Sequence, residues 1–286
     1  MNSITVSIPA TTSNIGPGFD CFGIALHIFN HVTIEKKETS SSLPVIVQEA
    51  ADSFFKTSNL PSFPFLMTVV GDVPQSRGLG SSATIRLGLI MALNRFENSP
   101  FSPSDLYALC AALEGHPDNT APAIFGGFTI ARKNHLPLRF SVSPELRFIL
   151  LIPDFEVSTT AARRLMPQTI SVADATSNIA NASVIATAFA TGDYELLRES
   201  FDDKLHQPFR KALVPFLPEV LNAATSAGAL GGWLSGSGST IAALALNHSS
   251  AELIAAAMEK ATPGKCRTII TTIDNSGARI RLKTKD

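Results

Sequence analysis

The sequence predicts an α+β protein with two domains. Strand-like and helix-like segments are mixed without the strict alternation of a doubly wound parallel sheet. The length of 286 residues fits one or two domains of about 150 residues each. Hydrophobic residues make up 45% of the chain and charged residues 16%, a balance typical of globular proteins rather than disordered ones. We expect an N-terminal domain over residues 1–152 and a C-terminal domain over residues 153–286.

The first half of the chain supplies most of the predicted strands. Ile4, Val6 and Ile8 alternate with polar residues, which predicts a half-buried strand. Apolar and β-branched runs predict further strands at residues 23–30, 32–35, 65–70, 124–131 and 147–152. Helices are predicted at residues 50–56, 83–94 and 103–114, with Ser81 or Ser82 near one N-cap and Pro103 at a first helical position. Turn-forming residues predict loops at 11–20, 38–44 and 71–77.

The second half of the chain is richer in predicted helices. A junction between domains is expected at residues 153–157. Helices are predicted at residues 158–165, 170–190 (one helix or a pair), 194–205, 217–227 and 250–262, the last from its amphipathic spacing. Strands are predicted at residues 230–234, 241–246, 266–273 and 278–282.

Charge and cysteine content narrow the class of function. The net charge is −1, so no basic excess is available to neutralise a nucleic-acid backbone, and we expect no nucleic-acid partner. Cys21, Cys110 and Cys266 are isolated, which fits a reducing compartment and neither a metal site nor a disulfide framework. No apolar run approaches the roughly 20 residues of a membrane span, and residues 1–10 lack the pattern of a signal peptide. We therefore expect a cytoplasmic protein with no membrane partner.

The most informative stretch is a glycine-serine loop, PQSRGLGSSA, at residues 74–83. Glycines let the main chain approach an anion closely, and the helix that follows directs free N–H groups and a positive dipole end at it, which favours phosphate binding. A P-loop is excluded because Ser81, not lysine, follows Gly80. Residues 78–83 formally match the dinucleotide fingerprint, so an NAD(P)-dependent oxidoreductase is one alternative. A serine-capped helix start with no ligand is another.

The loop is one of four segments that occur together in a recognisable order. They are TTSNIGPGFD at residues 11–20, the glycine-serine loop, EGHPDNTAP at residues 114–122 followed by Gly126-Gly127, and LSGSGST at residues 234–240. In this order they resemble the small-molecule kinases grouped as galactokinase, homoserine kinase, mevalonate kinase and phosphomevalonate kinase (GHMP kinases), over nearly the whole chain. The first and third segments resemble the homoserine kinase family in particular.

This resemblance implies a fold, a reaction and a set of ligands. The fold would be the two-domain GHMP kinase fold, with a nucleotide-binding N-terminal domain like domain 2 of ribosomal protein S5, a ferredoxin-like C-terminal domain and the active site in the cleft between them. The reaction would transfer the γ-phosphate of ATP to the side-chain hydroxyl of L-homoserine, a step of threonine biosynthesis, with Mg²⁺ as cofactor. A homodimer and a monomer both stay open.

The resemblance also assigns roles to residues. The ATP phosphates would lie against Pro74, Gln75, Ser76, Arg77, Gly78, Leu79, Gly80, Ser81, Ser82, Ala83 and Thr84. Mg²⁺ would lie near Ser82 and Glu114. The amino acid would face Asn14, Asp20, His116, Thr159, Arg163 and Arg210. Asp20, Asn119, Ser82 and Glu114 would be the catalytic set, and residues 234–240 a second glycine loop.

These roles agree with the chemistry of the residue types. Arginine forks suit a carboxylate, so Arg163 and Arg210 match one end of homoserine. Asp20 can hold the ammonium group or orient the hydroxyl, and Glu114 supplies the hard oxygen that Mg²⁺ prefers. Asn119 aligns with an aspartate of mevalonate kinase-like enzymes and cannot accept a proton. We therefore expect catalysis by positioning and charge stabilisation.

Simpler interpretations remain for most of these residues. Asn14 and Asp20 are also typical of turns, Glu114 and His116 of a helix end, and Asp118 and Asn119 of a loop. One of Arg163 and Arg164 is expected at the surface, and Arg210 could form a surface ion pair. Ser239 departs from the usual proline of the family, and Thr12-Ser13 from the usual Ser-Ala. The alternative functions are a kinase for another alcohol such as mevalonate, the oxidoreductase, and a non-catalytic binding protein.

Overall fold

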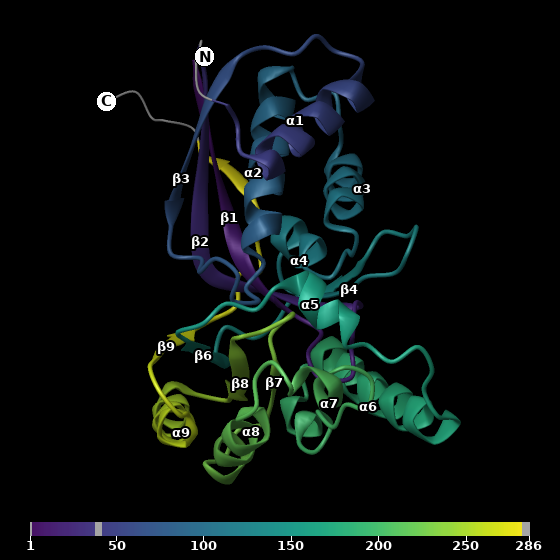
Figure 1. Ribbon diagram of the computed structural model, residues 1–286, viewed down its shortest axis with the longest axis vertical. Coiled ribbons are helices and arrows are strands. Elements are labelled where there is room, and N and C mark those ends of the chain that lie inside the picture. The colour runs from purple at the N-terminus through teal and green to yellow at the C-terminus, as the bar shows by residue number, and fades with distance from the viewer. Residues whose placement is uncertain (1, 38–41, 282–286) are drawn as a thin grey trace.

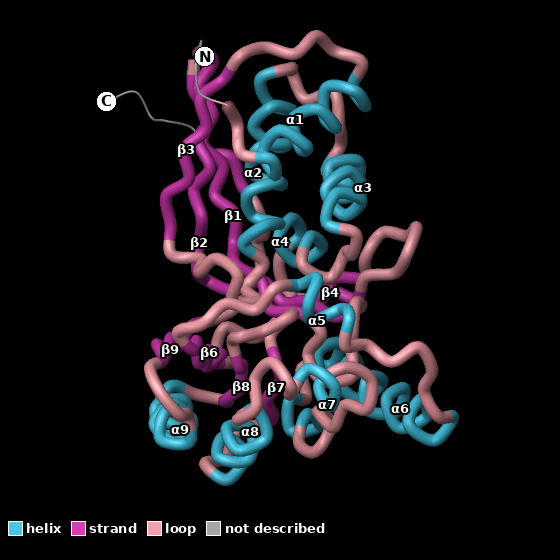
Figure 2. The backbone as a smooth tube through the Cα atoms, viewed as in Figure 1, coloured by secondary structure: helices cyan, strands magenta, loops and turns pink. Residues whose placement is uncertain are grey.

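The computed structural model describes residues 2–37 and 42–281, and it has two sheets with helices packed against each (Figures 1 and 2). This confirms the predicted α+β class. The loop predicted at residues 38–44 lies partly outside the described residues. None of the helices in the described part of the chain is long and apolar enough to cross a membrane.

The first sheet is antiparallel and six-stranded. Its strands are β1 (Ser3–Ser13), β2 (Phe22–Lys36), β3 (Phe65–Gly71), β4 (Phe128–Ile130), β5 (Leu138–Phe140) and β10 (Arg279–Arg281), in the order β10-β1-β2-β4-β5, with β3 also on β2. Two strands were expected at residues 23–30 and 32–35, but β2 is continuous over 15 residues. It pairs with β1 along most of its length across one bulge, with β4 near its start and with β3 near its end, and these pairings hold the segment extended.

Four helices cover one face of this sheet: α1 (Val45–Ser58), α2 (Ser81–Phe96), α3 (Pro103–Glu114) and α4 (Thr120–Phe125) (Figure 1). Helix α3 begins as predicted, because Ser102 and Asp105 form a reciprocal capping box and Pro103 occupies the first turn. The strand predicted over residues 124–131 is wrong in its first part, where α4 forms instead. Pro122 lies in the first turn of α4, where proline is tolerated because the first N–H groups of a helix have no helical acceptor.

The second sheet is four-stranded, in the order β7-β8-β6-β9. Its strands are β6 (Arg147–Pro153), β7 (Gly231–Leu234), β8 (Ile241–Ala245) and β9 (Cys266–Thr271). The remaining helices are α5 (Thr159–Arg164), α6 (Val172–Thr191), the 3-10 turn η1 (Tyr194–Leu197), α7 (Gln207–Arg210), α8 (Leu217–Ser226) and α9 (His248–Ala261). The helix predicted over residues 194–205 is reduced to η1, since Arg198 is extended with a ψ of 135° and Glu199 follows with a left-handed φ of 63°.

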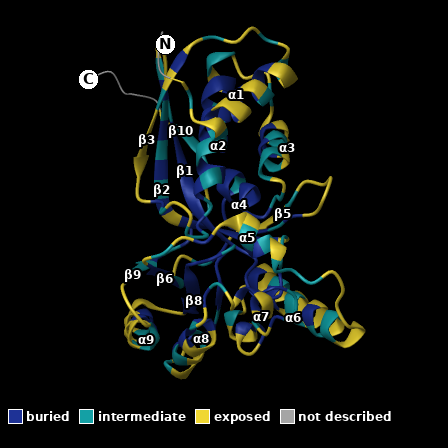
Figure 3. Cartoon of the chain, in the orientation of Figure 1, coloured by how far each residue is buried: buried dark blue, intermediate teal, exposed yellow. Residues whose placement is uncertain are grey.

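The two halves of the chain share a core where they meet. Phe22 and Phe128 from the first sheet pack in one cluster with Phe148 and Trp233 from the second. Figure 3 shows this buried region between the two sheets. The predicted division after residue 152 falls within β6, the first strand of the second sheet, and β10 returns to the first sheet. This shared core fixes how the loops of the two halves face each other.

Candidate active site

A cavity of about 1630 Å³ is lined by loops from both halves of the chain. One part is apolar, with Ile46 and Val47 of α1 opposite Phe65 and Met67 of β3. The glycine-serine loop forms the middle. Charged side chains gather at the other part, where Asp20, His116, Asp118, Arg163 and Arg210 line the wall.

The glycine-serine loop is tied to the protein through its main-chain oxygens. Four successive carbonyls accept hydrogen bonds from residues behind the loop: Ser76 from Val157 N (3.3 Å), Arg77 from Thr240 N (3.2 Å), Gly78 from Ser235 Oγ (2.7 Å) and Leu79 from Thr11 N (3.2 Å). Because these carbonyls are engaged, the loop does not aim their negative ends at the cavity. The second glycine loop, predicted from LSGSGST, thus braces the first.

Two glycines of the loop have no room for a side chain. A Cβ on Gly78 would lie 2.1 Å from the carbonyl oxygen of Ser235, and one on Gly80 would lie 2.0 Å from Thr11 Oγ1. Both have a left-handed φ, 73° and 69°. Close contact and backbone conformation therefore both require glycine at these positions.

Helix α2 starts at the end of this loop with its N-terminus at the cavity. Gly80 is the N-cap, so Ser81 and Ser82 lie near it as predicted, in the first turn, and neither side chain caps the helix. The first N–H groups of a helix carry no helical partner and a partial positive charge, which suits a phosphate. Ser82 Oγ donates a 2.7 Å hydrogen bond to Oε2 of Glu114, a carboxylate only 5% exposed.

Arg86 is a member of this site that sequence reasoning missed. Its guanidinium donates to Oε1 of Glu114 at 2.6 Å and to Glu49 of α1 at 3.1 Å. Arg86 follows Ser82 by four residues, so both side chains leave the same face of α2. That spacing, within a predicted helix, was the signal that could have found it.

At the charged part of the cavity, Asp20 and Arg163 form a two-pronged ion pair. Nη1 and Nη2 of Arg163 lie 3.0 Å and 2.8 Å from the two carboxylate oxygens of Asp20. The pair is open to solvent, with the Arg163 side chain 38% and the Asp20 side chain 33% exposed. It joins the loop before β2 to α5, and both charged groups can be reached from the cavity.

Arg210 is buried, which rules out the surface ion pair considered from the sequence. It is 2% exposed and donates a 2.8 Å hydrogen bond to the carbonyl of Gly236. Burial lowers the pKa of Arg210 to about 10. Its guanidinium carbon lies 5.0 Å from the ring centre of Phe19, and that ring also stacks on His206. No carboxylate among residues 2–37 and 42–281 is bonded to this buried cation, so it can receive an anion from the cavity.

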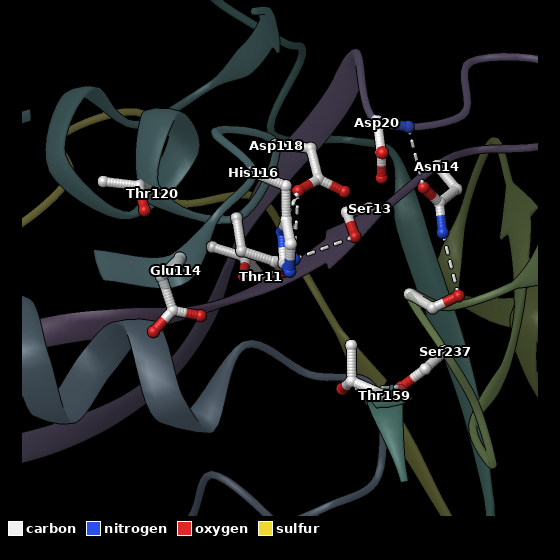
Figure 4. Close-up of polar contacts among 12 residues, drawn as sticks. Thr11, Ser13, Asn14, Asp20, Glu114, His116, Asp118, Thr120, Thr159 and Ser237 are labelled. Carbon is white, nitrogen blue, oxygen red and sulfur yellow. Dashed lines mark hydrogen bonds and ion pairs between the residues drawn. The ribbon is translucent and has the colours of Figure 1, made fainter. Parts of the chain in front are cut away.

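Several polar side chains between these parts hold the loops together (Figure 4). Asn14 donates to the Gly236 carbonyl at 2.8 Å and accepts from the main-chain N–H of Asp20 at 3.0 Å. Asn119 accepts from Thr11 Oγ1 at 2.7 Å and donates to Ser13 Oγ at 3.0 Å. Both amides are thus engaged within the protein.

His116 and Asp118 are paired beside them, Nδ1 to Oδ1 at 2.9 Å. Burial favours a neutral imidazole, but the hydrogen bond to Asp118 and its charge prevail and raise the pKa of His116. Burial likewise opposes ionisation of Asp118, but His116 outweighs it and lowers the pKa of that carboxyl. Thr159 begins α5 with its hydroxyl 3.4 Å from that of Ser237 (Figure 4).

The predicted residues converge on the cavity with three exceptions. Pro74, Ala83 and Thr84 do not line it. Ala83 and Thr84 are fully buried in α2, where Thr84 accepts a hydrogen bond from Asn30, so their side chains face the sheet. Phe19 and Asp118 belong to the site surroundings without having been assigned there.

The two departures from the family pattern serve the packing of the loops. Thr12 Oγ1 accepts a hydrogen bond from Trp233 Nε1 at 2.9 Å, and its hydroxyl can donate to Ser235 Oγ at 2.8 Å because the Ser235 proton is given to the Gly78 carbonyl. Ser239 is buried and its hydroxyl donates to the carbonyl of Phe155 at 2.7 Å, a bond that proline could not make. Neither Thr12 nor Ser239 lines the cavity, but Ser13, the other residue of the first departure, does, and its hydroxyl accepts a 3.0 Å hydrogen bond from Asn119.

Comparison with known proteins agrees with this arrangement. Residues 45–127 match the GHMP kinases N terminal domain and residues 185–264 match the GHMP kinases C terminal domain. The chain is 40% identical to a homoserine kinase of Trichormus variabilis, over 91% of this chain and 92% of that protein. It is 36% identical to one of Caldicellulosiruptor saccharolyticus, over 97% and 96%.

Solved structures give the same result. The crystal structure of homoserine kinase from Cytophaga hutchinsonii superposes with a TM-score of 0.88 at 26% identity, covering 98% of each chain. Mevalonate kinase from Methanococcus jannaschii is more distant, with a TM-score of 0.71 at 16% identity over 95% and 98% of the chains, and shows the shared fold alone. From its sequence relatives and its fold, this chain belongs to the homoserine kinase family of the GHMP kinases.

Proposed function

We propose that this chain transfers the terminal phosphoryl group of ATP to the side-chain hydroxyl of L-homoserine, forming O-phospho-L-homoserine. The observation that carries the proposal is one continuous cavity with a main-chain anion cradle beside two arginines and an aspartate. The relatives named homoserine kinase, which match over most of their length, support the same acceptor.

The glycine-serine loop and the start of α2 bind the phosphates. The loop presents main-chain N–H groups, because its carbonyls are held from behind, and the helix adds its positive end. The apolar part of the cavity beside Ile46 and Met67 can take the flat base of the nucleotide. These groups are fixed by the fold, so they need little reorganisation during transfer.

The residues near α2 fit a magnesium ion. Ser82 and Glu114 place a hydroxyl and a carboxylate 2.7 Å apart at the phosphate cradle. Within residues 2–37 and 42–281, no group of three or more His, Cys, Asp or Glu side chains is arranged to hold a metal. Mg²⁺ is usually held by one or two carboxylates together with substrate phosphates, so such a partial site is what it requires. When bound, it supplies positive charge to the phosphate oxygens.

The charged part of the cavity matches the two ionic groups of the acceptor. Arg163 and Arg210 receive the carboxylate, and Asp20 receives the ammonium group. Asp20 and Arg163 pair with each other in this structure. A zwitterionic acceptor can take over both contacts, because its ammonium group can replace Arg163 beside Asp20 and its carboxylate can replace Asp20 beside Arg163. Mevalonate has a carboxylate for the arginines but no ammonium for Asp20.

The transfer itself relies on position and charge. Asn119 has no basic group and both ends of its amide are engaged, so it holds Thr11 and Ser13 in place beside the loop. Phosphoryl transfer passes through a loose transition state that demands little covalent chemistry from the protein. We propose that Arg77, Arg163 and Arg210 hold the reactants and balance their charge.

ADP release measures this proposal directly. The assay supplies ATP and Mg²⁺ with L-homoserine, mevalonate, galactose or no acceptor, and mass spectrometry identifies the product. Turnover with homoserine alone is the expected result. Turnover only with another alcohol would keep the phosphate site and reject the acceptor.

Location and assembly remain separate proposals. All three cysteines are free, which supports a reducing, cytoplasmic location. Fluorescent tagging in cells of the source organism tests that location. A homodimer stays a prediction, and sedimentation equilibrium distinguishes it from a monomer.

A further inference from the structure

The carboxylate of Glu114 is held from two sides, and the two contacts differ in kind. Ser82 Oγ donates to Oε2 at 2.7 Å, and Arg86 Nη1 donates to Oε1 at 2.6 Å. The Ser82 hydroxyl can keep this bond while its own oxygen faces the cavity. The guanidinium has no lone pair to offer a metal, and it places its bulk and a fixed positive charge against Oε1, which disfavours a metal ion at that oxygen.

Arg86 is itself fixed in place. Its second nitrogen donates to Glu49 at 3.1 Å, so the planar guanidinium spans α1 and the end of α3. The Arg86 side chain is 15% exposed and that of Glu114 only 5%. Arginine stays charged at all relevant pH values, so the hydrogen bond from Arg86 to Oε1 does not depend on the protonation state of Arg86.

Blocking one oxygen has different consequences for different cations. Ca²⁺ takes six to eight oxygen ligands and readily chelates both oxygens of one carboxylate. Mg²⁺ is smaller, needs a near-octahedral arrangement and takes one carboxylate oxygen together with phosphates and water. With Arg86 against Oε1, Oε2 is the favoured metal ligand of Glu114, which suits Mg²⁺ and disfavours the two-pronged contact that Ca²⁺ readily makes.

We propose that Arg86 is a positioning residue that makes this site selective for Mg²⁺ over Ca²⁺ by occupying Oε1 of Glu114. The inference rests on the proposed function, since it requires a metal-nucleotide complex at Ser82 and Glu114. It assigns a role to a residue that touches neither the acceptor nor the phosphate loop.

Calorimetry of nucleotide binding tests this without turnover. The dissociation constant of a non-hydrolysable ATP analogue is measured on the full chain with Mg²⁺ and with Ca²⁺, and the ratio of the two constants (Ca²⁺ over Mg²⁺) is the readout. In Arg86→Gln we expect this ratio to fall about tenfold, within the range found when a residue orienting a metal ligand is changed.

Two control variants distinguish the effect of the contact between Arg86 and Oε1 from the effect of a change in local charge. Glu49→Gln changes the local charge but leaves the contact between Arg86 and Glu114, so the ratio should stay within about twofold of the wild-type value. Arg95→Gln removes an exposed arginine near the end of the same helix and should also leave the ratio unchanged. Arg86→Met serves if the glutamine variant does not fold.

The outcomes are distinct. If Arg86→Gln shifts both dissociation constants in parallel, or if Glu49→Gln shifts the ratio by as much in the opposite direction, local charge alone is responsible and the inference is overturned. If the wild-type chain binds the analogue with neither metal, the result contradicts the proposed function, and it also overturns this inference, which rests on that function. A fall in the ratio confined to the Arg86 variants supports it.

Discussion

The two parts of the cavity to which we assign binding differ in their chemical groups: main-chain groups in one and charged side chains in the other. At the proposed phosphate loop, four successive carbonyls are bonded to the rest of the protein, and we assign phosphate binding to main-chain N–H groups. At the proposed acceptor end, we assign binding to charged side chains, and Asp20 and Arg163 are paired with each other and open to solvent. On this proposal the phosphate part is set by folding, whereas the acceptor part exchanges an internal ion pair for the substrate's charges.

The largest effect is expected from a change in the fixed part, Gly78→Ala. The new Cβ would meet the Ser235 carbonyl oxygen at 2.1 Å at a φ of 73°. Left-handed strain and overpacking together should lower the free energy of unfolding by about 3 kcal/mol. Nucleotide affinity should fall by roughly 100-fold, equal to about 2.7 kcal/mol. Thermal unfolding and calorimetric titration measure the two effects.

Gly192→Ala is the matched control for that strain. Gly192 has a φ of 78°, but no atom lies within 4 Å of the position that a Cβ would take. Gly192→Ala therefore introduces the same left-handed backbone strain as Gly78→Ala without a steric clash. We expect about 1–2 kcal/mol of destabilisation and unchanged nucleotide affinity. Equal loss of affinity in both variants would show that the contact between the two glycine loops is unimportant.

In the acceptor part, Arg210→Ala should have the greatest effect. Removing a buried, desolvated partner of a carboxylate costs about 2–5 kcal/mol. The KM for homoserine should rise on the order of 100-fold, while the dissociation constant of the nucleotide stays the same. Steady-state kinetics and nucleotide titration measure these separately. A parallel loss of nucleotide affinity would mean that Arg210 serves the phosphate rather than the acceptor.

A smaller effect is expected for Arg163→Ala, because this arginine is half exposed and partly screened. The KM for homoserine should rise about tenfold, near the strength of one solvated charge-assisted hydrogen bond. The neighbouring Arg164→Ala is the control, since Arg164 is exposed, and its KM should stay within about twofold. A larger rise in the KM for homoserine in Arg164→Ala than in Arg163→Ala would assign the carboxylate to Arg164.

The smallest effect at neutral pH is expected for His206, which stacks on Phe19 behind the acceptor part. Burial lowers the pKa of His206 to about 4, below its ordinary value, so the unfolded chain takes up a proton first as the pH falls. Stability is therefore complete above about pH 6.5 and declines between about pH 6.5 and pH 4, by up to about 3 kcal/mol.

Chemical unfolding of His206→Gln across that pH window checks this. The variant should lose less stability than the wild-type chain on going from pH 7 to pH 4.5. His248→Gln, which changes an exposed histidine, is the control. Identical pH profiles for wild type and His206→Gln would contradict the assignment.

The same division explains what could be predicted from the sequence. The glycine loop at residues 74–83 and the helix after it could be predicted because glycine requirements and a helix start are local properties; its binding of phosphate stays a prediction. The helices α3 and α9 were found because capping and amphipathic spacing are also local. Long-range pairing was not visible: the length of β2 depends on its pairing with β1, β3 and β4. The helix predicted over residues 194–205 stops early because the chain is extended at Arg198 and left-handed at Glu199.

Side-chain partners were the least predictable part of the site. The sequence suggested Arg163 and Arg210 through motif resemblance, but not that one is paired with Asp20 and the other buried against Gly236. Arg86 escaped notice although its spacing from Ser82 was available. Its partner Glu49 lies on α1, far along the chain, and only the folded structure brings the two together.

One measurement tests the central claim most directly, that charged side chains select the acceptor. It compares kcat/KM for L-homoserine, 4-hydroxybutanoate, which lacks the ammonium group, and 3-aminopropan-1-ol, which lacks the carboxylate. Loss of the carboxylate leaves two arginines without a partner, so 3-aminopropan-1-ol should fall on the order of 10³-fold or more, and 4-hydroxybutanoate by a smaller factor. Values for all three within tenfold of one another would contradict the account.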